Sequence, residues 1–152
     1  MKLPVLAFVL LLLLGLGGPL AADAAKKARH VANGSGTSLV NGVDLPFEFE
    51  AAGRSKQADG RARFDLSGLG TLEGAVNCLD VEGNRVTLSG KLDRPVDGYY
   101  THFALVAVDN GPAQQPSTDT YWPFISHAPI PCEHSLEAPS RAAITSGDIR
   151  VR

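Results

Sequence analysis

Apolar and polar residues alternate almost strictly along several short stretches of this chain. In residues 44–51, one phase holds Leu45, Phe47 and Phe49, and the other phase is mostly acidic. A period of two residues is typical of a β-strand with one buried face. A slip of one residue would turn every buried side chain to solvent, so the pattern constrains the fold strongly. We therefore expect Phe47 and Phe49 to be buried and Glu48 to be exposed.

The same alternation recurs later in the chain, in residues 61–66, 71–81, 85–92 and 148–152. Residues 99–108 are apolar on both phases, which predicts a strand that is covered on both faces. The mature chain contains no convincing helical period. The expected core consists of Phe47, Phe49, Phe64, Leu72, Val76, Leu88 and Leu105.

Turn residues separate these stretches. Asn41-Gly42 between two valines is a strong hairpin signal. Residues 59–60 and 82–84 predict further turns, because Gly and Asn tolerate positive φ. Strands joined by short turns pair antiparallel. We therefore expect an all-β antiparallel meander of seven to nine strands that forms a small barrel, with a two-sheet β-sandwich as the alternative.

The first 24 residues have the features of a secretory signal peptide. Lys2 precedes an apolar run over residues 3–16, and Ala22-Asp23-Ala24 offers small residues for cleavage. The run is shorter than the roughly 20 residues of a membrane-spanning helix; an uncleaved anchor is the alternative. We expect a secreted or periplasmic protein without stable membrane insertion after cleavage. Residues 25–32 would form a flexible leader and residues 33–152 a single β-domain.

Cys78 and Cys132 are the only cysteines, and an exported chain enters an oxidising compartment. We expect a disulfide between them, with a pair of free thiols as the alternative. The alternation in residues 71–81 places Cys78 on the same face as Leu72 and Val76. No Cys-x-x-Cys spacing indicates redox catalysis.

Charge and motif content exclude several function classes. The 14 basic residues against 16 acidic ones give a formal net charge of −2, so nucleic acid is not an expected partner. The chain has no Gly-x-Ser-x-Gly motif of a serine hydrolase. The histidines fit no metal-ligand spacing, and we expect neither a metal site nor a cofactor. They are His30, His102, His127 and His134.

The candidate binding residues follow the most apolar stretch. They are Asp109, Asn110, Asp119, Tyr121, Trp122 and Phe124. Six prolines in residues 109–140 predict loop or edge strand. The Asp and Asn oxygens suit calcium or a turn cap, and the cap is preferred because only two carboxylates are near. The aromatic rings suit a sugar or apolar ligand, but we prefer a plug for one end of the barrel.

Four motifs occur in a fixed order along the chain. They are FEFEA at residues 47–51, VNCLDVEGN at 76–84, VDNG at 108–111 and GDIRV at 147–151. As a set they resemble a widespread family of small exported bacterial β-domain proteins without an established function. The resemblance covers most of the chain after the signal peptide and implies a β-architecture and export. It implies no catalytic residues.

These observations favour a secreted binding or interaction module over an enzyme. Its ligand would be a small molecule, a sugar or a protein. The alternatives are a secreted hydrolase with a carboxylate-based site and a structural cell-envelope protein. Two acids facing each other across a pocket would indicate the hydrolase. An aromatic platform without such a pair would indicate the binding module.

Overall fold

The computed structural model describes residues 29–111, 118–132, 136 and 142–152. The predicted signal peptide and the first half of the predicted leader lie outside these residues. The eight strands are β1 (His30–Val40), β2 (Val43–Arg54), β3 (Gln57–Leu66), β4 (Gly70–Glu82), β5 (Arg85–Val96), β6 (Tyr100–Val108), β7 (Thr120–Ser126) and β8 (Ala142–Val151). Within the described part of the chain, no helix is long and apolar enough to cross a membrane.

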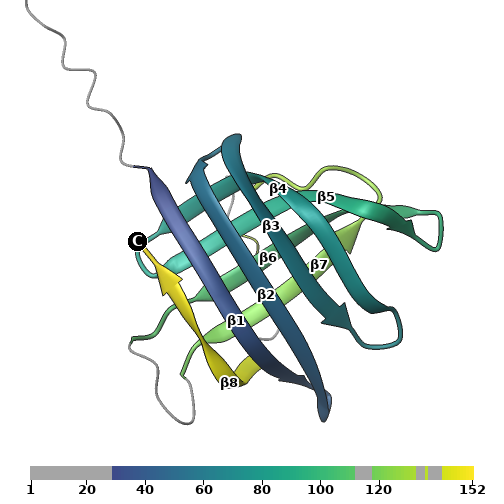
Figure 1. Cartoon of the computed structure of the whole chain (residues 1–152), viewed down its shortest axis with the longest axis horizontal. Coiled ribbons are helices and arrows are strands. Elements are labelled where there is room, and N and C mark those ends of the chain that lie inside the picture. The colour runs from purple at the N-terminus through teal and green to yellow at the C-terminus, as the bar shows by residue number, and fades with distance from the viewer. Residues whose placement is uncertain (1–28, 112–117, 133–135, 137–141) are drawn as a thin grey trace, which may run out of the picture.

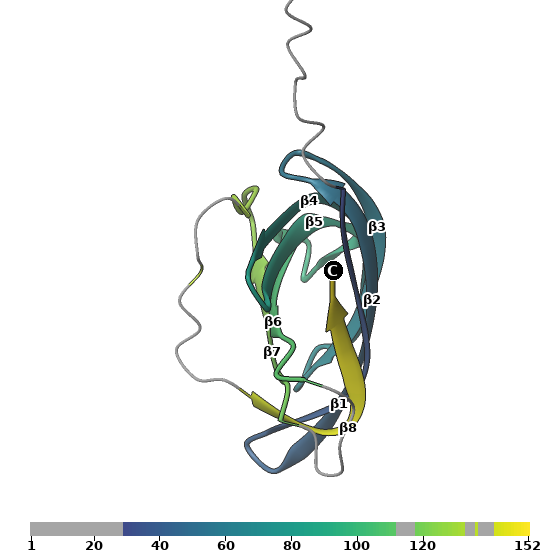
Figure 2. The same ribbon diagram turned by 90° about the vertical axis from the view of Figure 1, so that its left-hand side faces the viewer.

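The strands form a closed antiparallel barrel in sequence order (Figure 1). Each strand pairs with the next one, and β8 pairs with β1 to close the ring. β4 to β7 make one wall, and β1 to β3 with β8 make the other (Figure 2). The predicted all-β meander barrel is therefore confirmed, and the observed topology is not the two-sheet alternative.

Buried side chains from all eight strands fill the barrel interior. All seven residues that were predicted for the core are buried, and the acidic residues between them on β2 are exposed. Aromatic rings meet across the interior: Phe47 stacks on Tyr121 with ring centroids 4.1 Å apart, and Phe64 lies 5.6 Å from Phe103. The strand phase inferred from the sequence is thus correct for β2, β3 and β5.

The barrel begins earlier than expected. β1 starts at His30, inside the segment that was predicted to be a flexible leader, and Ala32 is completely buried. A Cβ atom at Gly34 would lie 2.8 Å from Cε1 of Phe49, so glycine leaves the space that this ring occupies. β1 is therefore part of the packed wall despite its small side chains.

The turn predicted at residues 59–60 is wrong. β2 ends at Arg54 and β3 starts at Gln57, so Gly60 lies inside a strand. A Cβ atom at Gly60 would lie 2.1 Å from the carbonyl oxygen of Glu50 on the neighbouring strand. Glycine is required here for the close approach of two backbones and not for a turn.

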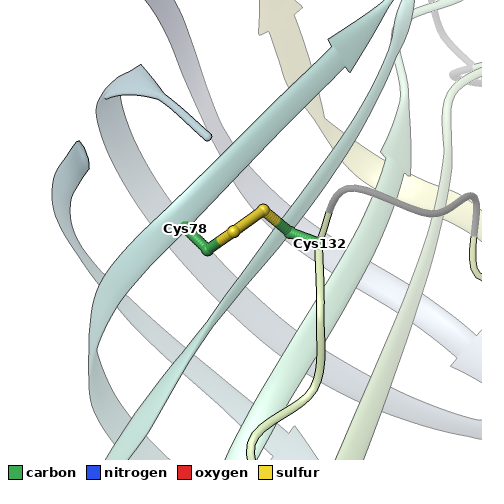
Figure 3. Close-up of a disulfide and its surroundings, with 2 residues drawn as sticks. All are labelled: Cys78 and Cys132. Atoms are coloured by element: carbon green, nitrogen blue, oxygen red, sulfur yellow. A yellow bond between two sulfur atoms is a disulfide. The ribbon is translucent and has the colours of Figure 1, made fainter. Parts of the chain in front are cut away.

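The predicted face of Cys78 is also wrong. The pairing of β4 with β5 shifts register between Val76 and Cys78, and Leu79 takes the next core position. Such a β-bulge changes the alternation of a strand at one point. The sulfur of Cys78 therefore points out of the barrel and bonds to Cys132 on the segment after β7 (Figure 3). The predicted disulfide is confirmed.

The outer face of β5 and β6 is buried as well. Between the core positions, these strands carry outward residues that are almost inaccessible: Thr87, Ser89, Ala104, Val106 and Val108. Described residues after β7 contact the neighbouring strands: Cys132 bonds to β4, and Arg85 of β5 donates a hydrogen bond to the carbonyl oxygen of Leu136. Burial on both faces of β6 agrees with the apolar character of both phases in residues 99–108.

The pairing of β7 is uneven. It pairs with β6 along its whole length, but among the described residues it pairs with β8 only at Thr120 and Tyr121. Pro123, which has no backbone N–H, lies in the part of β7 beyond these pairs. The ring is therefore closed here by little backbone pairing.

Candidate functional site

The structure divides the predicted site residues between two environments. Asp109, Asn110 and Asp119 lie where β6 ends and β7 begins, whereas the three aromatic residues lie on β7 itself. Of the predicted loop or edge strand, these aromatic residues take the edge strand: seven residues around Pro123 pair with β6, and among the described residues only Thr120 and Tyr121 pair with β8. Proline is tolerated in a strand that has a free edge.

Of these three aromatic residues, only Tyr121 faces the barrel interior. Trp122 and Phe124 occupy the opposite phase and lie half-buried on the outer wall, with their ring centroids 6.3 Å apart. The predicted plug therefore consists of one ring, which closes against Phe47 of β2. Because side chains alternate along a strand, Tyr121 cannot form one ligand platform together with Trp122 and Phe124.

The Tyr121 hydroxyl is enclosed in the core. Its oxygen has no hydrogen-bond partner within the described structure. Burial, and to a smaller extent the charge of Asp65, raises the pKa of Tyr121 well above its ordinary value. The hydroxyl therefore keeps its proton to a higher pH in the folded protein than in the unfolded chain.

The two aspartates join the end of β6 and the start of β7 to β8. The buried carboxylate of Asp119 accepts hydrogen bonds from the backbone N–H of Asn110 at 2.8 Å and of Ile149 at 2.9 Å. The Asp109 carboxylate accepts from the N–H of Gly111 at 3.0 Å and of Val151 at 3.1 Å. Each side chain thus connects its own segment to β8.

Asparagine side chains fix the same region. The amide of Asn84 donates to the carbonyl oxygen of Asp109 at 2.8 Å and to Oδ1 of Asn110 at 3.2 Å. The Asn110 amide donates to the carbonyl oxygen of Thr118 at 2.8 Å. The region is therefore an ordered hydrogen-bond network between three chain segments.

This network performs a structural task. The carboxylate oxygens accept N–H groups of β8 where β7 gives that strand little backbone pairing, so they help to close the barrel. The bond from Gly111 to Asp109 is the turn cap that the sequence suggests. Within the described residues, no three His, Cys, Asp or Glu side chains gather in a way that could hold a metal ion.

A second aromatic group, which sequence reasoning missed, lies at the other end of β6. We name it the Tyr99 cluster, and it consists of Tyr99, Tyr100 and His127. The Tyr99 ring lies 5.1 Å from each of the other two rings, edge-on to Tyr100 and tilted by 31° to His127. Tyr99 remains 56% exposed. Its position directly after the turn glycine Gly98 is the signal that could have separated it from the buried strand.

Hydrogen bonds hold the base of the Tyr99 cluster. The Thr101 hydroxyl donates to the carbonyl oxygen of His127 at 3.0 Å, which fastens the start of the segment after β7 to β6. The same hydroxyl lies 2.8 Å from Nδ1 of His102. Ser126 accepts a hydrogen bond from the N–H of Ala128 at 3.1 Å, which shapes the turn that carries His127.

Acidic side chains gather on the open outer face of β2 to β4. Glu48 and Glu50 lie there around a surface hollow of about 250 Å³, together with Arg61, Arg63 and Glu73. Glu73 forms ion pairs with both arginines. Arg61 donates a hydrogen bond to the Asp93 carboxylate, and this bond and the negative charge of Asp93 raise the pKa of Arg61 still further above its high ordinary value. These acids face cations and solvent, which suits a soluble surface better than a pair of catalytic carboxyls.

The fold and its cross-link define a disulfide-bonded all-β barrel domain. No family model, curated protein or solved structure matches the chain. The functional argument therefore depends on the geometry of the barrel and of its surface.

Proposed function

We propose that the protein is an exported binding domain whose ligand contacts the outer surface of the barrel at the Tyr99 cluster. The observation that carries this proposal is the contrast between two sets of aromatic rings. The interior rings are packed against one another from all sides, whereas Tyr99 is more than half exposed. A ligand would therefore meet the surface rings and not the interior.

The cluster is suited to recognition because its rings are already held in place. Tyr99 contacts Tyr100 and His127, and the backbone of His127 is tied to Thr101. Tyrosine offers a large apolar surface with a polar tip and loses little conformational entropy on binding. A preorganised group of this kind loses less free energy on binding than flexible side chains would.

Export is supported by two observations. The first 24 residues carry the pattern of a cleavable signal peptide. The disulfide joins two buried cysteines, and such cross-links persist in oxidising compartments. The resemblance to small exported bacterial β-domains agrees with a secreted or periplasmic location.

A panel of immobilised glycans, peptides and small molecules tests the proposal. Oxidised protein beginning at residue 25 would be compared with its Tyr99→Ala variant and with Leu69→Ala. Leu69 is a matched control, because it is another exposed apolar residue in a turn. We expect the wild type and Leu69→Ala to bind the same ligand and Tyr99→Ala to lose it while keeping its melting temperature.

Three outcomes would contradict the proposal. Equal binding by the Tyr99→Ala variant would place the ligand elsewhere on the barrel. A wild type that binds no member of the panel would favour the structural cell-envelope role. Turnover of a glycan that requires Glu48 or Glu73 would favour the hydrolase.

A further inference from the structure

The hydrogen bonds of Thr101 indicate which ring nitrogen of the neighbouring His102 carries a hydrogen. A hydroxyl group has one hydrogen, and Thr101 gives it to the carbonyl oxygen of His127. In the close contact between Thr101 and His102, Nδ1–H of the imidazole must then donate the hydrogen bond to the Thr101 oxygen. In the neutral ring, Nε2 of His102 is therefore an acceptor.

His102 belongs to the same outer surface as the Tyr99 cluster. Phe103 faces the interior, so Tyr100 and His102 share the outward phase of β6. Ser126 of β7 is the direct cross-strand partner of His102, one residue before His127. Two tyrosines and two histidines thus occupy adjacent positions at the start of β6 and just after β7, and together they supply both hydrogen-bond donors and acceptors.

The charges on the hairpin that carries the cluster are nearly balanced. Lys91 pairs across the strands with His102, and Arg94 follows on the same strand. Asp93 and Asp97 supply two negative charges, but Asp93 is ion-paired with Arg61 of β3. The hairpin and this partner therefore offer a charged ligand a surplus of only one positive charge.

These features point to one chemical class of ligand. Resting on the function proposed above, we infer that the Tyr99 cluster binds a neutral carbohydrate. A sugar ring has an apolar C–H face that packs on the ring of Tyr99, and its hydroxyls match mixed donors and acceptors. A purely apolar ligand would leave the polar atoms of His102 and the tyrosines unpaired, which lowers affinity. An acidic glycan or a phosphorylated ligand would find a surplus of only one cation, whereas such ligands are bound by clusters of cations.

A glycan array with neutral and acidic members tests this inference on the oxidised protein, followed by calorimetric titration with the best neutral oligosaccharide. Tyr99→Ala should weaken binding about tenfold, because one stacked ring is lost. Tyr99→Phe should stay within about threefold of the wild type if packing dominates. His102→Ala should also weaken binding, and Leu69→Ala should leave it unchanged.

The outcomes separate the two proposals. Binding of peptides or apolar molecules that depends on Tyr99 would overturn the carbohydrate inference and retain the binding function. Selective binding of acidic glycans would overturn the inference of a neutral ligand. Neutral glycan binding that is insensitive to both Tyr99→Ala and His102→Ala would overturn the assigned site. The absence of any ligand would overturn the proposed function itself.

Discussion

Replacing Asp119 with alanine removes the acceptor of two backbone hydrogen bonds at the point where the barrel closes. The N–H of Ile149 is buried on β8, and the N–H of Asn110 is half-buried at the end of β6. Alanine offers neither group a partner. The small volume that is vacated leaves little room for water to reach the buried N–H group of Ile149.

The cost follows from these two bonds. A buried polar group without a partner costs about 1–3 kcal/mol, and hydrogen bonds to a charged acceptor lie toward the upper end. Two such groups give about 3–5 kcal/mol for Asp119→Ala. Asp119→Asn keeps one acceptor oxygen but turns an amide N–H₂ toward the other donor, so we expect a loss of about 2 kcal/mol. A small domain has a total stability of about 5–15 kcal/mol, so these changes are large.

Urea unfolding of the oxidised protein, followed by the fluorescence of the single tryptophan, measures these losses. Asp59→Ala is the matched control, because Asp59 is exposed on the outer face of β3 and should change stability by less than about 0.5 kcal/mol. A loss below about 1 kcal/mol for Asp119→Ala, with an unchanged denaturant slope, would refute the role of this carboxylate in closing the ring.

Four further expectations follow from the structure. Phe49→Ala should cost about 3–5 kcal/mol in urea unfolding and Glu48→Ala close to nothing, because the first ring is buried and the second side chain is exposed; similar losses would contradict the strand phase. Replacing both Cys78 and Cys132 with alanine should cost about 4 kcal/mol in the chain-entropy model, and the unreduced wild type should show no thiol to an alkylating reagent. Above pH ~10 the unfolded chain loses the Tyr121 proton while the folded barrel keeps it. The free energy of unfolding should therefore fall with rising pH by up to about 1.4 kcal/mol per pH unit, and Tyr121→Phe should remove this part of the pH dependence. Calcium should leave the melting temperature of the wild type unchanged, since the oxygens of the two aspartates already accept backbone N–H groups; a calcium-dependent rise would show that they bind the ion instead.

Local alternation was sufficient to predict most of the barrel. The phase of β2 follows directly from its sequence, because a strand with one buried face has little freedom of register. Cys78 departs from the pattern since a β-bulge depends on how two strands pair, which alternation does not record. Gly60 was taken for a turn residue because glycine serves both turns and close backbone contacts.

The site residues were harder to place for a physical reason. Asp109 and Asp119 were identified as a turn cap, but their partners on β8 lie 42 and 30 residues away in the chain, respectively. Only closure of the ring brings these segments together. Tyr99 was assigned to the buried strand because the residues that follow it are apolar. β6 begins only at Tyr100, so Tyr99 lies in the turn before the strand and remains exposed.

Pro123 affects how readily molecules of this protein aggregate. The part of β7 beyond Tyr121 has an edge that β8 does not pair with in the described structure. Such an edge can accept a strand from another molecule, which begins edge-to-edge aggregation. Proline is tolerated in a strand at a position where an N–H group would not point toward the paired strand. The paired strand is β6, so the position of the missing N–H of Pro123 faces the unpaired edge of β7. The residue that makes β7 hard to recognise therefore removes a donor that an incoming chain would need, and it helps to keep the barrel dispersed at high concentration.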